Sequence, residues 1–212
     1  MAGRIAVIRH GQTQWSASGR HTSVTDIGLT AEGERQAGVV PALLAGLGLR
    51  PVTVLCSPRL RARITAELAG LHVDAIDEEL AEWAYGDYEG LTTEEITRRQ
   101  PGWAIFDDGA PGGETPPQVA DRADRVLGRA RAALEHGDVA LVGHGHFSRA
   151  LAVRWAGFPI TAGNAIAMDP AAVTVLGHHH GQQVLQHTNV VPMEMGPSDG
   201  APAADVGSAD HA

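Results

Sequence analysis

Two histidines in this sequence stand at the ends of short apolar runs. His10 comes after residues 4–8 (RIAVI), and His144 comes after residues 138–143 (DVALVG). Runs of this length with β-branched residues predict buried strands. Because loops at the carboxyl ends of parallel strands converge on one crevice, we expect His10 and His144 to share a site. A neutral imidazole in such a crevice is nucleophilic at mild pH.

A third apolar run, residues 52–56 (VTVLC), leads to cationic side chains at the same expected edge. Ser57 and Pro58 supply an N-cap and a first-turn proline for a helix that runs to about residue 69. The free N–H groups and the dipole of such a helix start favour an anion. Arg9 and Arg61 add guanidinium groups that match phosphate oxygens. Together these residues predict a phosphate pocket that contains a nucleophile.

The elements that position these residues are predicted to alternate between strands and helices. Three strands and one helix have been described above. The further predicted helices cover residues 30–47, capped by Thr30, and 147–155, and two more begin with capping boxes at 92–95 and 115–118. The further predicted strands lie at 72–76 and, as a pair, within 171–190. Such alternation predicts an α/β fold, a three-layer α/β/α sandwich around a mostly parallel sheet.

The composition limits the class of protein. The chain has 212 residues, 43% of them apolar, which suits one α/β domain, and no apolar run reaches the roughly 18 residues of a spanning helix or forms a secretory signal. We therefore expect a cytoplasmic protein with no membrane partner. The single cysteine, Cys56, excludes an internal disulfide framework and a thiolate zinc site. A pI of about 5.6 argues against a nucleic-acid partner.

We expect one domain over residues 1–192 and a disordered acidic tail over residues 193–212. Gly, Pro, Ala, Ser and Asp dominate the tail, a composition that does not bury a core. Residues 106–117 are also rich in Asp, Gly and Pro, but helix and strand signals resume at once after them. They therefore predict a surface loop within the domain.

Several segments of the sequence, in order, resemble the motifs of one known family. Arg9-His10-Gly11 is similar to the RHG signature of the histidine phosphatase superfamily, also called phosphoglycerate mutase-like. The other matching segments are LTAEGERQA from Leu29, SPRLRARITA from Ser57, LAEWAYGDYEG from Leu80, Gly-Glu-Thr at residues 113–115 and Val-Gly-His-Gly at residues 142–145. The resemblance covers about residues 4–190 and implies the phosphoglycerate mutase-like fold.

The resemblance also implies roles for individual residues. His10 would become phosphohistidine, with Arg9, Arg61 and His144 around the phosphoryl oxygens. Glu82 would protonate the leaving group and then activate water. The cations would neutralise the transition-state charge, so no metal or other cofactor is expected. The residues that we expect to bind substrate are Ser16, Thr22, Ser23, Tyr85, Gly145 and His146.

Three departures from the mutases indicate the kind of substrate. Only about ten residues separate Gly90 from Pro101, where cofactor-dependent mutases carry a long basic insertion. In addition, Ser16 replaces an Asn of the mutases, and His146 replaces a Gly. Residues 147–149 are expected beside the substrate with His146. The pattern looks like bacterial acid phosphatases and fungal sedoheptulose-1,7-bisphosphatases, which implies a phosphatase for a small phosphorylated metabolite, a sugar or glycolytic phosphate. A phosphoglycerate mutase, a catalytically weak phospho-ligand regulator and a homodimer stay open.

Other features have competing explanations. His144 with His146, and the triple histidine at residues 178–180, could ligate metal, but no fixed set of acidic or cysteine partners accompanies them. We therefore expect no metal site. Trp15, Trp83 and Tyr85 fit the substrate mouth and core packing equally well.

Overall fold

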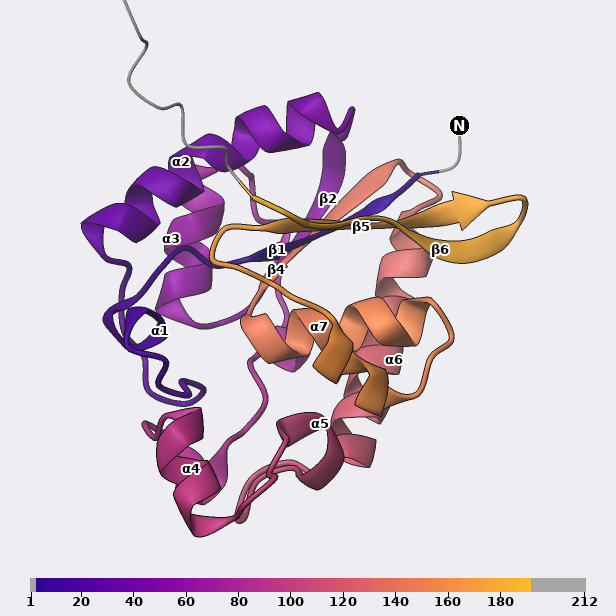
Figure 1. The fold of residues 1–212 in the computed structure, drawn as a ribbon. Coiled ribbons are helices and arrows are strands. Elements are labelled where there is room, and N and C mark those ends of the chain that lie inside the picture. The colour runs from indigo at the N-terminus through magenta and orange to yellow at the C-terminus, as the bar shows by residue number, and fades with distance from the viewer. Residues whose placement is uncertain (1–2, 192–212) are drawn as a thin grey trace, which may run out of the picture.

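The computed structural model describes residues 3–191, so the expected tail at 193–212 lies outside the described residues. One six-stranded sheet forms the centre, in the order β3-β2-β4-β1-β5-β6 (Figure 1). Its strands are β1 (Ile5–Arg9), β2 (Pro51–Cys56), β3 (Ala75–Ile76), β4 (Asp138–Gly143), β5 (Val173–His179) and β6 (Gln182–Val190). The first four are mutually parallel, and β5 and β6 form an antiparallel hairpin beside β1.

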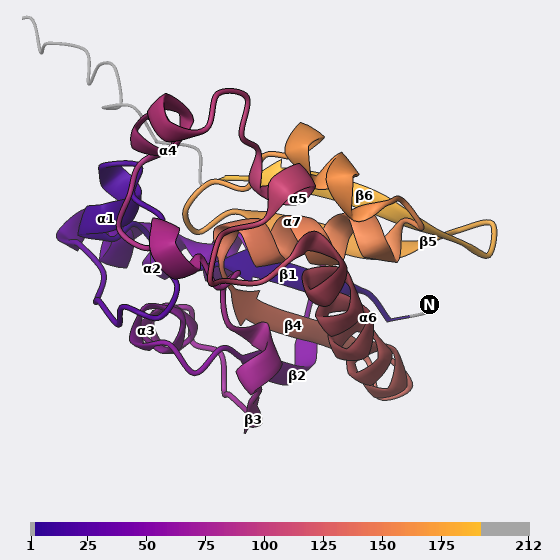
Figure 2. The same cartoon turned by 90° about the horizontal axis from the view of Figure 1, so that it is seen from below.

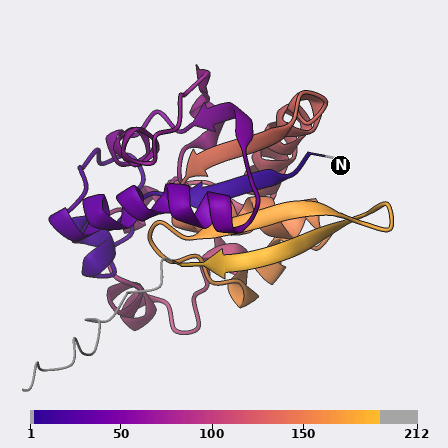
Figure 3. The same cartoon turned by 90° about the horizontal axis from the view of Figure 1, so that it is seen from above.

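Helices cover both faces of this sheet, and the predicted three-layer, mostly parallel architecture is confirmed. The helices are α1 (Gln14–Ala17), α2 (Ala31–Gly46), α3 (Leu60–Leu68), α4 (Thr93–Arg99), α5 (Ile105–Asp108), α6 (Pro116–Ala133) and α7 (Gly145–Trp155). Short 3₁₀ turns occupy Glu78–Leu80, Gly86–Tyr88 and Ile160–Ala165. Helices α2 and α3 pack on one face, with α2 across the sheet in Figure 3, whereas α6 and α7 cover the other face in Figure 2.

The central strand β1 shows why the apolar runs in the sequence are continuous. Ile5 and Val7 contribute to the core beneath α6 and α7, and Ala6 and Ile8 to the core beneath α2 and α3. All four are buried because a strand inside a parallel sheet is covered on both faces. Among residues 3–191, no helix is both long and apolar enough to cross a membrane.

Most predicted helix starts are confirmed, but one is wrong. The Thr30 side chain caps α2, and capping boxes begin α4 at Thr92 and α6 at Thr115. Helix α3, however, begins at Leu60 with Arg59 as its N-cap and no side-chain cap hydrogen bond. The Ser57 hydroxyl accepts only a long hydrogen bond from Arg59 N, at 3.4 Å, and its short contact, at 2.7 Å, is with the buried His144, so Ser57 is not the N-cap of α3.

Two pairs of glycines let backbone segments cross at very short range beside the site. A Cβ on Gly11 would lie 2.2 Å from the carbonyl oxygen of Gly33, the third residue of α2. A Cβ on Gly113 would lie 2.1 Å from the carbonyl oxygen of Ala84, and one on Gly86, at φ +50°, would lie 2.2 Å from the carbonyl oxygen of Pro111. Only glycine fits at such contacts. The loop after β1 and the segment after Leu80 are therefore in direct contact with the backbone of neighbouring segments.

Candidate active site

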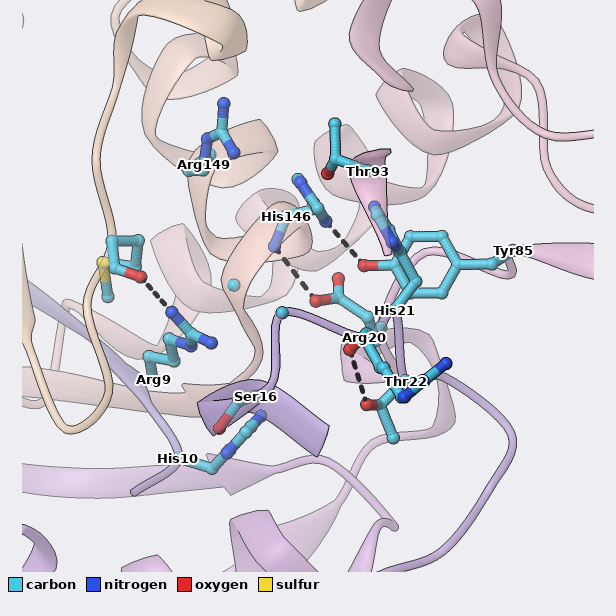
Figure 4. A pocket seen from close by; sticks show the side chains of 14 residues that line it. Arg9, His10, Ser16, Arg20, His21, Thr22, Tyr85, Thr93, His146 and Arg149 are labelled. Carbon is cyan, nitrogen blue, oxygen red and sulfur yellow. Dashed lines mark hydrogen bonds between the residues drawn. The ribbon is translucent and has the colours of Figure 1, made fainter. Parts of the chain in front are cut away.

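A cavity of about 190 Å³ lies at the carboxyl ends of β1 and β4, the edge that the sequence predicts (Figure 4). Eight residues singled out from the sequence line it: Arg9, His10, Ser16, Thr22, Glu82, Tyr85, Gly145 and His146. Glu82 is the one carboxylate among the described residues that line it. The alternating α/β order thus brings together residues more than 130 positions apart, in a space that suits a small molecule.

Three other predicted site residues do not line this cavity. His144 lies directly behind His10, with the two ring centroids 5.2 Å apart at an edge-to-face angle of 65°. Arg61 and Ser23 are buried beside it, and the Ser23 carbonyl accepts a hydrogen bond from Arg61 Nη2 at 3.2 Å. These residues form a layer that supports the cavity wall.

The backbone holds His10 in one orientation and one tautomer. The His10 N–H donates to Gly143 O at 3.0 Å, and its carbonyl accepts from the Ala171 N–H at 3.1 Å. Its Nδ1 lies 2.7 Å from the carbonyl oxygen of Gly11. A carbonyl only accepts, so Nδ1 carries the proton and Nε2 of the neutral ring keeps its lone pair. Burial, with Arg9 and Arg61 nearby, lowers the pKa of His10 well below its ordinary value, so the ring stays neutral in mild acid.

The tautomer of His144 is fixed in the same way by its two partners. Arg61 Nε donates to His144 Nδ1 at 3.2 Å, so the ring proton sits on Nε2 and is donated to Ser57 Oγ at 2.7 Å. Burial and the Arg61 charge hold the pKa of His144 well below its ordinary value. His144 is therefore a neutral ring, so the positive charge beside His10 comes from Arg9 and Arg61.

Arg61 is fully buried and its guanidinium is almost fully used within the protein. Besides His144, it donates from Nη1 to Thr25 O at 3.1 Å and from Nη2 to the carbonyls of Thr22 and Ser23 at 3.1 and 3.2 Å. One of its five N–H groups stays free for another acceptor. Arg61 thus acts mainly through its charge and by tying loop 22–25 to α3.

Arg9 has more hydrogen-bonding capacity left. Its Nη1 donates to Met168 O at 2.5 Å, and its Nε is buried with no partner among the described residues. Its guanidinium lies against the backbone of Gly145, where an added Cβ would be 3.4 Å from Arg9 Cζ. A buried N–H without an acceptor is unusual, and a phosphoryl oxygen in the cavity would supply one.

Glu82 is held by backbone N–H groups at the start of α7. Its Oε1 accepts from Trp83 N at 2.9 Å and from Phe147 N at 2.8 Å, and its Oε2 accepts from His146 N at 3.0 Å. Oε1 is fully engaged, and Oε2 has a lone pair left for a proton or a further donor. The carboxylate is thus fixed in the cavity wall with one oxygen available for proton transfer.

Aromatic and histidine side chains form a second wall of the cavity. The Tyr85 hydroxyl lies 2.5 Å from His146 Nδ1, and the rings of His21 and His146 are stacked 5.7 Å apart (Figure 4). Burial and the Glu82 carboxylate raise the pKa of Tyr85 well above its usual value, so Tyr85 stays a phenol. Trp83 is fully buried in the core, which settles its role as packing.

Several cavity residues are absent from the sequence-based set: Gly19, Arg20, His21, Thr93 and Met168. Arg149 also lines the cavity and belongs to the segment 147–149 expected beside the substrate. Thr93 and Met168 follow no recognisable signal. The expected anion site at the start of α3 is filled by the protein itself, because Leu60 N donates to Asp26 Oδ1 at 2.8 Å.

The four histidines at the cavity should make the protein lose stability in acid. Burial lowers the pKa of His10, His21, His144 and His146. In the unfolded chain they take up protons below about pH 6.5, whereas the folded protein resists this until lower pH. Their contribution to stability is therefore complete above about pH 6.5 and falls as pH drops below it, by at most about 1.4 kcal/mol per histidine per pH unit.

Urea denaturation between pH 7.5 and pH 4.5 measures this effect. His146→Gln should flatten the acid side of the stability curve. Substitution of the exposed His136 by Gln serves as the matched control. An unchanged slope in the His146 variant, relative to the control, would contradict the assignment of His146 as a buried neutral ring.

Comparison with known proteins agrees with this geometry. A family model described as the histidine phosphatase superfamily (branch 1) matches residues 5–191. The chain is 44% identical over 182 residues to a Mycobacterium tuberculosis protein named acid phosphatase, covering 86% of this chain and 90% of that protein. It is 36% identical over 192 residues to the sedoheptulose 1,7-bisphosphatase of Saccharomyces cerevisiae, covering 74% of this chain and 69% of that protein.

A solved structure gives the same result for the fold. The product of an open reading frame from Mycobacterium tuberculosis superposes with a TM-score of 0.87 at 43% identity, covering 89% of this chain and 98% of that chain. The family match, these identities and the shared fold extend over almost all of the described residues. The chain is therefore a member of the histidine phosphatase superfamily, branch 1.

Proposed function

We propose that this protein is a phosphatase of the histidine acid phosphatase type, which hydrolyses a small phosphomonoester through a phosphohistidine on His10. The observation that carries the proposal is the hydrogen bond from His10 Nδ1 to Gly11 O, because it leaves an unprotonated Nε2 at the cavity beside Arg9. The relatives named acid phosphatase and sedoheptulose 1,7-bisphosphatase support a sugar or glycolytic phosphate as substrate.

In the first step, His10 Nε2 attacks phosphorus with its lone pair and the ester P–O bond breaks. The proton on Glu82 Oε2 passes to the leaving oxygen, which departs as an alcohol. Arg9, through its free Nε–H, and the nearby charge of Arg61 stabilise the negative charge on the phosphoryl oxygens. Burial and the Arg61 charge keep His144 neutral beside His10, and the hydrogen bonds with Ser57 and Arg61 fix its ring.

In the second step, water hydrolyses the phosphohistidine. Glu82, now a carboxylate, takes a proton from the water while the water oxygen bonds to phosphorus and the P–N bond breaks. Inorganic phosphate leaves, and the neutral His10 ring and the protonated Glu82 are restored. One carboxylate therefore serves both steps, and Glu82 is the one in position among the described residues that line the cavity.

Turnover should be independent of divalent metal, because Arg9 and Arg61 supply the positive charge that a metal provides in other phosphatases. The described residues contain no group of three His, Cys, Asp or Glu side chains arranged to hold a metal ion. EDTA should leave kcat for p-nitrophenyl phosphate unchanged, and vanadate should inhibit competitively. Loss of activity in EDTA, with recovery on adding zinc, would overturn this prediction.

The proposal is tested by trapping the intermediate. A ³²P-labelled phosphomonoester mixed with the full chain and quenched in alkali should leave label on one peptide, that containing His10. Because phosphohistidine survives alkali and is lost in acid, the label should disappear on acid treatment. Label that survives acid, as phosphoserine does, or no label while turnover continues, would refute the phosphohistidine.

Product analysis separates the mutase alternative. Addition of 3-phosphoglycerate with 2,3-bisphosphoglycerate should yield inorganic phosphate rather than 2-phosphoglycerate.

The cytoplasmic location, the absence of a nucleic-acid partner and a homodimer stay predictions from the sequence.

A further inference from the structure

Arg149 is a cation of the cavity that the proposed chemistry does not use. It lies on α7, four residues after Gly145, and its side chain lines the same cavity as His10. Figure 4 shows Arg149 well separated from His10, with the guanidinium of Arg9 nearer to the histidine. The cavity therefore has one cationic end at Arg9 and a second cation away from it.

The protein holds the Arg149 guanidinium in a fixed position. Its Nε and Nη2 both donate to the carbonyl oxygen of Gly163, at 2.9 and 2.6 Å, and its Cζ lies 4.7 Å from the centre of the Phe106 ring. These contacts use one edge and one face of the guanidinium. Two N–H groups on Nη1 and one on Nη2 stay available to an acceptor.

The charge of Arg149 has no acidic partner within the part of the chain that the structure describes. The arginines that do form ion pairs there are Arg20, Arg35, Arg98, Arg122, Arg125, Arg129 and Arg154. Arg154, further along the same helix, is paired with Asp124 at 2.7 Å. A partly buried cation without a counter-charge is costly, and an anion brought by a ligand would remove that cost.

Arg20, which lines the cavity beside Thr22, is already committed to partners within the protein (Figure 4). Arg20 donates to Gly90 O at 2.6 Å and lies 3.4 Å from Glu95 Oε2. Its charge is therefore largely neutralised before any ligand binds. Arg149, by contrast, forms no ion pair with any described residue, and the Glu82 carboxylate attracts its charge only from a longer range.

We propose that Arg149 binds a second anionic group of the substrate. The natural substrate is then a small metabolite with a phosphate ester at one end and a second phosphate or a carboxylate at the other. The inference rests on the proposed function, since the first phosphate is the one that reacts at His10. A guanidinium with adjacent free N–H groups suits both kinds of oxyanion, and the experiment distinguishes them.

The test compares three substrates with the full chain. Glucose 6-phosphate carries no second anion, 6-phosphogluconate carries a carboxylate, and fructose 1,6-bisphosphate carries a second phosphate. The wild type should have a kcat/KM at least about tenfold higher for one or both of the doubly anionic substrates than for glucose 6-phosphate. Whichever of the two is favoured identifies the second group.

Arg149→Gln should reduce that selectivity ratio by about 10- to 100-fold, the scale of lost hydrogen bonds to a charged group, and mainly through KM. Arg149→Lys keeps the charge but loses the planar geometry, so its ratio should be intermediate. Arg154→Gln, a matched change on the same helix outside the cavity, should leave the ratio at the wild-type value. The Lys variant gives an independent result if the Gln variant folds poorly.

Two outcomes would overturn the inference and leave the proposed function standing. One is a wild type that turns over p-nitrophenyl phosphate through His10 but shows no preference for a second anion. The other is an Arg149 variant that lowers kcat/KM equally for all three substrates, as a purely structural role requires. Absence of His10-dependent turnover of every phosphomonoester would instead refute the proposed function itself.

Discussion

Replacing His10 by alanine should lower kcat for any phosphomonoester by about 10⁴-fold or more, the scale on which loss of a covalent nucleophile acts. Without Nε2 no group remains to accept the phosphoryl group, and the arginine charge and Glu82 have no intermediate to act on. The variant should remain folded, because the strand hydrogen bonds of residue 10 come from its backbone. Steady-state kinetics and circular dichroism measure the two effects separately.

His136→Ala is the matched control for this result, since His136 is exposed and precedes the amino end of β4, whereas the cavity lies at the carboxyl end of that strand. The control should keep wild-type turnover and should still be labelled in the trapping experiment. If His10→Ala retained activity within about 100-fold of the wild type, another residue would have to be the phosphoryl acceptor. In that case neither step of the proposed mechanism would survive.

Replacing Glu82 by glutamine should slow alkyl phosphates by about 10²- to 10⁴-fold, the range of general acid–base catalysis, and aryl phosphates far less. An alkoxide needs a proton in order to leave, whereas a phenolate leaves with little help. The amide oxygen can still accept the N–H groups of Trp83 and Phe147, but the amide nitrogen then faces the His146 N–H. A stability measurement must therefore accompany the kinetics.

Comparing alkyl with aryl phosphates separates a loss of proton donation by Glu82 from a general loss of activity in the variant. Glu114→Gln is the control, because Glu114 lies near Glu82 in the fold but is paired with Arg122 and does not line the cavity. It should change the alkyl-to-aryl rate ratio little, whatever it does to stability. Equal slowing of glucose 6-phosphate and p-nitrophenyl phosphate in the Glu82 variant would show that Glu82 does not protonate the leaving oxygen.

The sequence predicts those parts of the fold that depend on local chemistry. The run RIAVI is a central strand because it is covered on both faces, and Thr30, Thr92 and Thr115 cap helices through their own hydroxyls. The ends of the predicted strands alone bring His10, His144, Arg9 and Arg61 to one edge, whereas the placement of Glu82 there follows only from the family motifs. These features can be predicted because they depend on residues close in sequence or on the known order of motifs in the family.

The remainder depends on distant partners that no local pattern reveals. Ser57 has the residue type and the following proline of a good helix cap, yet its hydroxyl accepts from His144, 87 residues away. Similarly, the Glu89 carboxylate accepts hydrogen bonds from the N–H groups of Ser23 and Thr25. It thereby fixes the loop over residues 22–25, whose Ser23 carbonyl accepts a hydrogen bond from Arg61. Whether a hydroxyl oxygen such as that of Ser57 accepts from a local N–H group or from a distant donor is decided only by the folded structure.

The glycine crossings divide this site into a part that resists change and a part that tolerates it. Near His10 and Glu82 the backbone touches backbone at Gly11 and Gly113, so any side chain added there collides with main-chain atoms that have nowhere to go. Arg149 and Thr93, by contrast, reach the cavity from helices α7 and α4 through their side chains alone. Substrate preference can therefore diverge by single substitutions at the rim while the phosphoryl-transfer geometry stays the same, a separation that favours the appearance of new specificities from one inherited catalytic frame.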